Sequence, residues 1–340
     1  MQQATTLAAI CAKAHAGQAL YFDDLRFLAQ TSERDEVQQM ARRIRQQYAQ
    51  ASILTYAERA GQPLLAPRSH AHACTSLAAA RELIAWLRLN LPERAHDCFG
   101  VADVITLHEQ TQLPTETILR HLFAAGQHYL RGDDEHLLRL ALCNSDAYTD
   151  QQHPIAALWL RVLREAQQMG LLASAAVLLG ADVAEATYLH WLQRIRIIQD
   201  YSQRTVGSGF LSVVYVVPMA QTSLSDTDLH RIALTRLYLN GIPHHQLRGY
   251  VAQSVPPAHV MLAARAGIDD LGELGNRRAT LQAALQLYGY RLQQRDMYYQ
   301  PVVAAPEAAA SRTVAVQMPS ALYRTAPVQP MYQPVPDMLN

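Results

Sequence analysis

The sequence has little cysteine and no excess of charge of either sign, and both features exclude classes of function. Cysteine occurs only at positions 11, 74, 98 and 143, with no CxxC pair. Neither a disulfide framework nor a four-cysteine zinc site is therefore expected. The 29 lysines and arginines equal the 29 aspartates and glutamates, without a long block of either sign. The charge therefore gives no reason to expect nucleic acid or an anionic membrane as a partner.

Long apolar runs are also absent. No run approaches the roughly 20 residues of a membrane span. The first residues, MQQATTLAAICAKAHAG, lack a basic segment followed by a long apolar one, as a secretory signal would have. We therefore expect a soluble, cytoplasmic protein. Half of the 340 residues are apolar, enough for one large α/β domain with a tail or for two smaller domains.

The stretch from 158 to 218 has the clearest pattern of helices and strands. Apolar residues recur at helical spacing up to Met169, and Leu171 to Leu179 is a nearly uninterrupted apolar run. A second helical passage follows, and then the β-branched and aromatic run from Phe210 to Val217. Helix, buried strand, helix, buried strand is typical of βα units in a parallel sheet, so we expect the α/β class.

Other segments extend this alternation. Helices are expected over residues 20–48, 78–89, 115–125, 225–241, 256–266 and 278–287. Strands are expected over residues 53–56, 62–66, 242–250 and 268–271, and residues 99–107 are expected to begin as a strand. From Pro301 onward Pro, Ala, Val and Gln dominate without a period that would build a core. Residues 301–340 are therefore expected to be a disordered tail.

A series of motifs between residues 18 and 300 points to one family. They read, in order, GQALYFDDLRFLAQ with QQMARRIRQQ, ILTY, LFAAGQHYLRGDDEHLL, WLRVLREAQQMGLLASAAVLLG, LQRIRIIQD, RLYLNGIPHHQLRGY, AARAGIDDLG and YGYRLQQRDMYY. Together they resemble the radical S-adenosylmethionine (radical SAM) enzymes that include dehypoxanthine futalosine cyclase, aminofutalosine synthase and the deazaflavin cofactor synthase. Each motif is short, and their shared order makes the resemblance specific.

The resemblance implies a TIM-barrel-like parallel (β/α) barrel over residues 51–300, with the family's C-terminal portion at 220–300 and a helical segment at 1–50. It also implies a [4Fe-4S] cluster, S-adenosylmethionine and a role in futalosine-pathway menaquinone biosynthesis or deazaflavin cofactor biosynthesis. Four residues match family positions and are candidate ligand-binding residues: Glu135, Arg196, Gln199 and Asp200. Because Arg196 and Asp200 lie four apart on a helix, a simple surface ion pair is an equally open interpretation.

Departures from the family pattern bear on function. The family's CxxxCxxC loop binds three irons through three thiolates and leaves the fourth iron for S-adenosylmethionine, whereas the loop here, PRSHAHACTS, offers only Cys74. The interval from Cys74 to Cys98 is short, so about one βα unit near residues 75–98 is expected to be missing. Arg131 and Asp133 stand where the family has glycines, and GADVA replaces GHVET. We therefore expect neither the cluster nor S-adenosylmethionine to bind.

Three functions stay open at this stage. The combined losses favour a non-catalytic relative that acts as a binding or partner protein, for example beside an intact radical SAM paralogue. A second interpretation is an active enzyme of the same pathway type, with cluster ligands recruited from Cys74, Cys98 and Cys143. A third is a metal-dependent hydrolase, because His70, His72 and Cys74 point to one face of an extended chain and could ligate zinc. A polar surface loop is the alternative interpretation of that last pattern.

Overall fold

Seven strands form one parallel sheet. The computed structural model describes residues 6–58, 71, 74–143, 154–180, 182–248 and 255–302. Within these residues the strands are ordered β2-β3-β4-β5-β6-β1-β7, and every pair is parallel. The strands are β1 (Ile53–Ala57), β2 (Tyr129–Leu130), β3 (Leu172–Leu178), β4 (Ser212–Val216), β5 (His244–Leu247), β6 (Asp270–Glu273) and β7 (Arg291–Arg295). The expected α/β class with a parallel sheet is confirmed.

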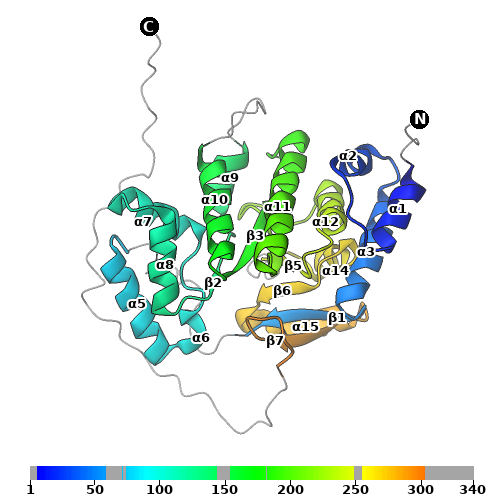
Figure 1. Ribbon diagram of the computed structural model, residues 1–340. Coiled ribbons are helices and arrows are strands. Elements are labelled where there is room, and N and C mark those ends of the chain that lie inside the picture. The colour runs from blue at the N-terminus through cyan, green and yellow to red at the C-terminus, as the bar shows by residue number, and fades with distance from the viewer. Residues whose placement is uncertain are drawn as a thin grey trace.

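Helices connect the strands and cover the outer face of the sheet. They are α1 (Leu7–His15), α2 (Phe22–Gln30), α3 (Arg34–Tyr48), α5 (Leu77–Asn90), α6 (Pro92–Ala95), α7 (Val101–Thr111), α8 (Thr115–Ala125), α9 (Glu135–Cys143), α10 (Pro154–Gln168), α11 (Glu185–Val206), α12 (Asp226–Tyr238), α14 (Pro257–Ala266) and α15 (Arg278–Gln286). Figure 1 shows α1–α3 at one end of the molecule and α5–α8 at the other. No helix in the described residues has the length and hydropathy needed to span a membrane.

The alternation read from residues 158–218 is confirmed. Helix α10 ends before Gly170, whose φ of 83° allows the tight turn into β3. Every residue of β3 after the first is buried, and so is all of β4. Helix α11 follows β3 and precedes β4 along the chain. It is capped by Gly207 in the left-handed conformation. Both strands are largely apolar and buried because helices cover one face and the barrel interior lies on the other.

The prediction of a strand that begins near residue 99 is wrong apart from one residue. Only Gly100 forms a β-bridge, with Arg131, and helix α7 begins at Val101. The Asp103 carboxylate accepts the backbone N–H of Gly100 at 2.6 Å. This cap starts a helix whose inner face is fully buried, and it outweighs the β-branched composition of the segment.

Strand β7 was not expected from the sequence, and its position is informative. β1 pairs with β6 on one side and with β7 on the other. In a sequentially ordered barrel the first strand pairs with the second, so β7 lies where the second strand would stand. Between Cys74 and Gly100 the described residues form α5 and α6 and no strand, which agrees with the expected loss of one βα unit. The expected strand over 62–66 and the tail beyond Val302 lie outside the described residues.

The strand register lines the barrel interior with polar residues. Ser174, Ser212 and His244 are register partners in one layer. In the next layer Gln246 and Thr55 both pair with Asp270. Because alternate residues of a strand point to opposite faces, the apolar residues between these positions face the helices. These interior positions therefore carry polar side chains, whereas Ala176 and Val214 share the second layer with Gln246 on the β3 and β4 side.

Candidate functional site in the barrel interior

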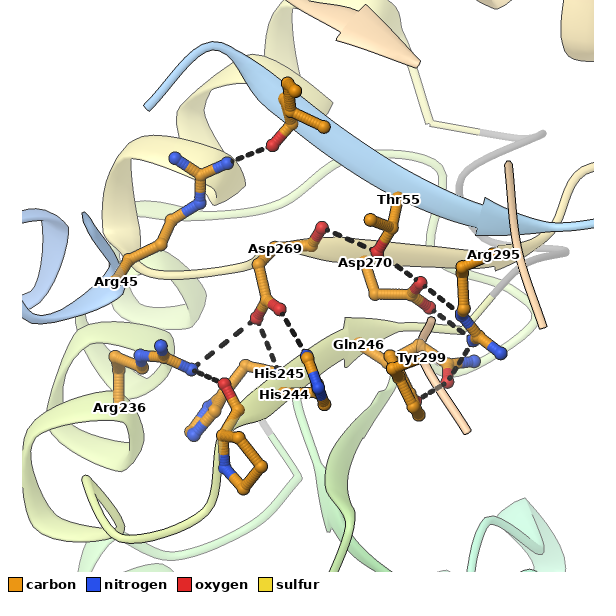
Figure 2. Close-up of polar contacts among 12 residues, drawn as sticks. Arg45, Thr55, Arg236, His244, His245, Gln246, Asp269, Asp270, Arg295 and Tyr299 are labelled. Atoms are coloured by element: carbon orange, nitrogen blue, oxygen red, sulfur yellow. Dashed lines mark hydrogen bonds and ion pairs between the residues drawn. The ribbon is translucent and has the colours of Figure 1, made fainter. Parts of the chain in front are cut away.

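The centre of the interior is a buried ion pair between β7 and β6. Arg295 donates from Nε to Asp270 Oδ2 at 2.7 Å and from Nη2 to Asp270 Oδ1 at 2.8 Å (Figure 2). The Asp270 side chain is 0% exposed and that of Arg295 is 7% exposed. Thr55 also donates to Asp270 Oδ2, at 2.7 Å. This two-bond geometry fixes the guanidinium firmly in one orientation.

Tyr299 fills the space beside this pair. Its ring stacks on His244 with centroids 4.1 Å apart and an interplanar angle of 6°. The Arg295 guanidinium lies 3.9 Å from the centroid of the same ring, and the Tyr299 hydroxyl donates to Gln246 Oε1 at 2.8 Å. Burial raises the pKa of Tyr299 well above its ordinary value, although Arg295 opposes the shift. The phenol is therefore neutral and acts as a hydrogen-bond donor.

Arg295 and Tyr299 both belong to YGYRLQQRDMYY, the passage that resembles the family's closing motif. Their contacts are therefore compatible with an active relative and do not separate the functional alternatives. The features that do separate them must lie at positions where this chain departs from the family.

One such departure lies at the carboxyl ends of the strands, where Asp133 bridges two arginines. Asp133 Oδ2 is 3.3 Å from Arg248 Nε, and Asp133 Oδ1 is 3.8 Å from Arg131 Nη1. The three side chains are 10–16% exposed. Asp133 follows β2 and Arg248 follows β5, and β3 and β4 lie between those strands in the sheet. The Asp133–Arg248 pair therefore crosses the carboxyl ends of β3 and β4.

Arg131 is further fixed by the backbone of a neighbouring segment. Its Nε donates to the Asp97 carbonyl at 2.8 Å and its Nη2 to the Cys98 carbonyl at 3.1 Å. Between Arg131 and Asp133, a Cβ on Gly132 would come within 2.6 Å of the Ser174 carbonyl oxygen. This glycine is thus required by the packing of β2 against β3. The segment that is glycine-rich in the family therefore makes contacts within the protein here.

An iron–sulfur cluster binds thiolates, so the surroundings of each thiol bear on cluster binding. Burial raises the pKa of Cys74 to about 12, and Asp103 adds to the shift. Burial raises the pKa of Cys98 well above its ordinary value. Cys143 lies at the end of α9 beside other charged groups, Arg139 and Asp182. Burial therefore favours the protonated form of the Cys74 and Cys98 thiols, and the expected absence of a cluster stays a prediction.

The described residues contain no group of three or more His, Cys, Asp or Glu side chains placed to hold a metal ion. His70 and His72 lie outside the described residues, whereas Cys74 is buried. The zinc site built from these three residues therefore stays a prediction.

The four family-matched residues are not brought together. Glu135 begins α9, and its Oε1 accepts the backbone N–H of Met219 at 3.2 Å, just past the carboxyl end of β4. Gln199 lies at the opposite end of the sheet: its Oε1 accepts the N–H of Phe210, ahead of β4, at 2.6 Å. Arg196 and Asp200 share helix α11 with Gln199. The ligand-binding role of all four stays a prediction, and the structure places them in two separate regions.

The surface ion pair considered from the sequence is confirmed. Arg196 Nε donates to Asp200 Oδ1 at 2.8 Å, and Arg196 Nη1 donates to the Tyr238 carbonyl at 2.5 Å. Gln199 is 2% exposed, and a Cβ on Gly209 would collide with its amide. These residues of α11 hold the turns that precede β4 and β5.

Sequence reasoning missed Arg248 and Asp270 as site residues. Asp270 lies within the quoted AARAGIDDLG passage, but nothing local shows that it faces the interior. Arg248 meets Asp133, which follows a strand distant in sequence, so its role has no local signal. Only the register of the sheet reveals both.

Comparison with known proteins supports the fold. No family model matches the chain. The 5-amino-6-(D-ribitylamino)uracil--L-tyrosine 4-hydroxyphenyl transferase of Methanosphaerula palustris is 26% identical over 175 residues. This match covers 48% of the chain and 45% of the relative, so the chain spans less than half the length of that relative.

Two solved structures share the architecture. HydG, described as a maturase of the [FeFe]-hydrogenase, is 12% identical with a TM-score of 0.51, over 84% of this chain and 75% of that one. HydG from Carboxydothermus hydrogenoformans is 12% identical with a TM-score of 0.52, over 86% of this chain and 80% of that one. The chain therefore has the TIM-barrel-like α/β fold of radical SAM enzymes, as the motifs predicted.

Proposed function

We propose that this chain is a non-catalytic protein with a radical SAM-like barrel, acting in the cytoplasm as a binding or partner protein in cofactor biosynthesis. The Asp133–Arg248 ion pair across the carboxyl ends of the strands carries the proposal. Parallel barrels bind their substrates at that end. Here side chains of the chain itself, including Arg131, lie across it.

The replaced glycines support the proposal. Glycine lets a backbone approach a ligand closely, because no Cβ intervenes. Arg131 and Asp133 add charged side chains at two such positions, and both are committed to partners within the protein. A cosubstrate would have to displace these contacts before it could meet the backbone.

The chain also lacks the usual ligands for an iron–sulfur cluster. Cys74 and Cys98 are buried thiols with raised pKa values, and the loop before Cys74 has no other cysteine. One missing feature could be compensated, but ligands, glycines and a βα unit are absent together from the pattern. Their combined absence favours binding over radical chemistry.

The relative suggests the pathway type. Its name describes transfer of a 4-hydroxyphenyl group from L-tyrosine to 5-amino-6-(D-ribitylamino)uracil. We place this chain beside an intact radical SAM paralogue of that deazaflavin type or of the futalosine (menaquinone) type. Affinity capture with an intact enzyme of each type tests the partnership, and no association with either removes it.

Anaerobic reconstitution with iron and sulfide tests the central point. We expect no cluster absorbance and, after addition of S-adenosylmethionine and dithionite, no 5′-deoxyadenosine. An intact family member serves as the positive control. A cluster band together with 5′-deoxyadenosine would instead establish the active-enzyme alternative, and its loss in Cys74→Ala and Cys98→Ala variants would identify the recruited ligands.

The hydrolase alternative has its own test. Protein purified without added metal is analysed for zinc and other divalent metals. We expect far less than one metal per chain. Stoichiometric metal that is lost on substitution of His70 and His72, with metal-dependent turnover, would favour the hydrolase instead.

A further inference from the structure

Helices α1 and α3 form a cavity in the helical layer, at the end of the molecule opposite α5–α8 (Figure 1). Its volume is about 340 Å³, at the lower end of the range for small-molecule sites, about 300–1,000 Å³. Met40, 6% exposed, and Ile44, 1% exposed, line its apolar floor. Because α3 also packs against α12 and α14, the core of the protein holds this floor in place.

Polar side chains line the rest of the cavity. Cys11 and His15 come from α1, and Glu36, Gln39 and Arg43 come from α3. The α3 residues recur every three or four positions, so they lie in one row along the helix. Apart from Cys11, these side chains form no hydrogen bond or ion pair within the described residues. Their polar atoms are therefore available to a ligand.

Glu36 and Arg43 place opposite charges in the row on α3. They are seven residues apart, which corresponds to about 10.5 Å of helical rise, and Met40 lies between them in the sequence. Both charges act on the Cys11 thiol: burial raises its pKa, Glu36 adds to the rise and Arg43 opposes it. Cys11 of α1 therefore lies within the field of both ends of the row.

His15 adds a polar group at the Arg43 end of the cavity. It is the last residue of α1, and Gln47 Nε2 donates to its carbonyl at 3.5 Å. Gln47 lies about one helical turn after Arg43 on α3. The cavity therefore has a carboxylate at one end, a guanidinium and an imidazole at the other, and apolar side chains between them.

This order of groups fits a short peptide with free ends. Such a peptide has an ammonium at one end and a carboxylate at the other, and each forms charge-assisted hydrogen bonds with the opposite charge. Three extended residues span about 10 Å, close to the rise that separates Glu36 from Arg43. A single amino acid carries the same two charges too close together to reach both side chains. A ligand with one sign of charge would meet a like charge in the cavity.

We propose that the cavity between α1 and α3 binds peptides of about three residues with free termini, with the ammonium at Glu36, the carboxylate at Arg43 and His15, and the middle side chain on Met40. This site goes beyond the proposed function, because it lies in the helical layer and needs no ligand in the barrel.

Calorimetric titration of the full chain with the tripeptide alanyl-leucyl-alanine tests the site. We expect saturable binding of one tripeptide per chain. The N-acetylated and the C-amidated tripeptides each lose one terminal charge and should bind about tenfold more weakly. L-Leucine should also bind about tenfold more weakly or worse, because it reaches only one end of the cavity.

Substitutions on α3 assign each end of the peptide. Glu36→Gln should weaken binding of the free tripeptide about tenfold and leave binding of the N-acetylated one unchanged. Arg43→Gln should do the same for the free and the C-amidated tripeptides. Asp35→Asn and Arg42→Gln are the matched controls and should bind like wild type. Both controls change exposed charges in the same turns of α3 that do not line the cavity.

Alkylation of Cys11 by iodoacetamide, followed by mass spectrometry, gives a second measurement. Saturating tripeptide should slow the reaction at Cys11, which lines the cavity, and leave the rate at half-buried Cys143 unchanged. Binding with no protection of Cys11 would place the peptide elsewhere and overturn the proposal.

The titrations can overturn it as well. No saturable binding would remove the site, and equal binding of the free and blocked tripeptides would remove the pairing with Glu36 and Arg43. Equal losses in the matched controls would reduce the effect to net charge. None of these results depends on a cluster or on S-adenosylmethionine, so failure here leaves the non-catalytic proposal to its own test.

Discussion

Asp269 and Asp270 are neighbours in sequence, yet they serve opposite faces of the sheet (Figure 2). Asp269 Oδ1 meets Arg236 of α12, on the helix side, at 3.5 Å and accepts the His245 N–H at 2.7 Å, while its Oδ2 lies 3.0 Å from His244 Nδ1. Asp270 faces the interior and pairs with Arg295 at 2.7 Å. The outer pair joins the sheet to its helical layer, and the inner pair orders the polar interior.

The two arginines differ in what remains if the carboxylate is lost. Arg236 is fully buried and keeps one other acceptor, the Pro243 carbonyl at 3.0 Å, whereas its Nε and Nη2 have no hydrogen-bond partner among the described residues. Arg295 also donates to the Asp296 carbonyl and contacts Gln246 Oε1. Arg236 therefore contributes mainly to the stability of the fold, whereas Arg295 contributes mainly to the candidate site.

The largest expected effect is on the outer pair. Asp269→Asn leaves the Arg236 charge buried and unpaired, so the free energy of unfolding should fall by about 3–5 kcal/mol. Urea denaturation followed by circular dichroism measures it. Combining Asp269→Asn with Arg236→Met should recover part of the loss, because no unpaired charge then remains. A loss below about 1 kcal/mol would show that the outer pair is not structural.

The inner pair should cost less to break. Asp270→Asn should lower the free energy of unfolding by about 2–3 kcal/mol, because Arg295 keeps the Asp296 carbonyl and Gln246 Oε1 as acceptors whereas Arg236 keeps only the Pro243 carbonyl among the described residues. The same urea titration measures it, with Thr55→Val as a control that removes only one hydrogen bond to Asp270. If Asp270→Asn costs as much as Asp269→Asn, the distinction between the two faces fails.

The outer face should also give the protein a pH dependence. His245 is fully buried beside Tyr215, at 2.7 Å, and burial and then Arg236 lower its pKa well below the ordinary value. Below about pH 6.5 the unfolded chain binds a proton at this histidine that the folded chain does not. Stability should therefore fall by up to about 1.4 kcal/mol per pH unit as the pH drops below 6.5.

The measurement is the free energy of unfolding of wild type and His245→Gln between about pH 7.5 and pH 5.5. The variant should show a shallower slope, because one differentially titrating group is removed. Identical slopes would show that His245 titrates alike in the folded and unfolded chains.

The smallest effect is expected at the exposed pair on α11. Asp200 is 43% exposed, and a partly exposed ion pair contributes little because solvent screens it. Asp200→Ala should therefore change the free energy of unfolding by less than about 1 kcal/mol. A larger loss would show that the pair is structural, and a change in the binding of a small molecule would restore it as a candidate site.

Periodicity alone predicted the middle of the barrel correctly. The run from α10 to β4 has strong apolar patterns and clear glycine stops, so its elements could be predicted before the structure. Helix α7 could not, because the Asp103 cap on Gly100 decides between helix and strand there. β7 reads RLQQR, which has no β-branched or aromatic residue, and it is a strand because β1 offers it an edge.

The candidate site was less accessible to sequence reasoning. Family motifs placed Glu135 and Arg196 in one candidate set, but a motif does not say which end of the sheet its residues reach. The contact between Asp133 and Arg248 depends on two strands that are separated by β3 and β4. Such a contact follows from sheet order and register, which no local pattern reports.

The most direct test of the account is a calorimetric titration of the purified chain with S-adenosylmethionine. Because Arg131, Asp133 and Arg248 pair with one another across the carboxyl ends of the strands, we predict no saturable binding. An intact radical SAM enzyme titrated under the same conditions gives the reference signal. Saturable binding near one molecule per chain, abolished by Arg248→Glu, would contradict the claim that the chain closes this end of the barrel with its own side chains.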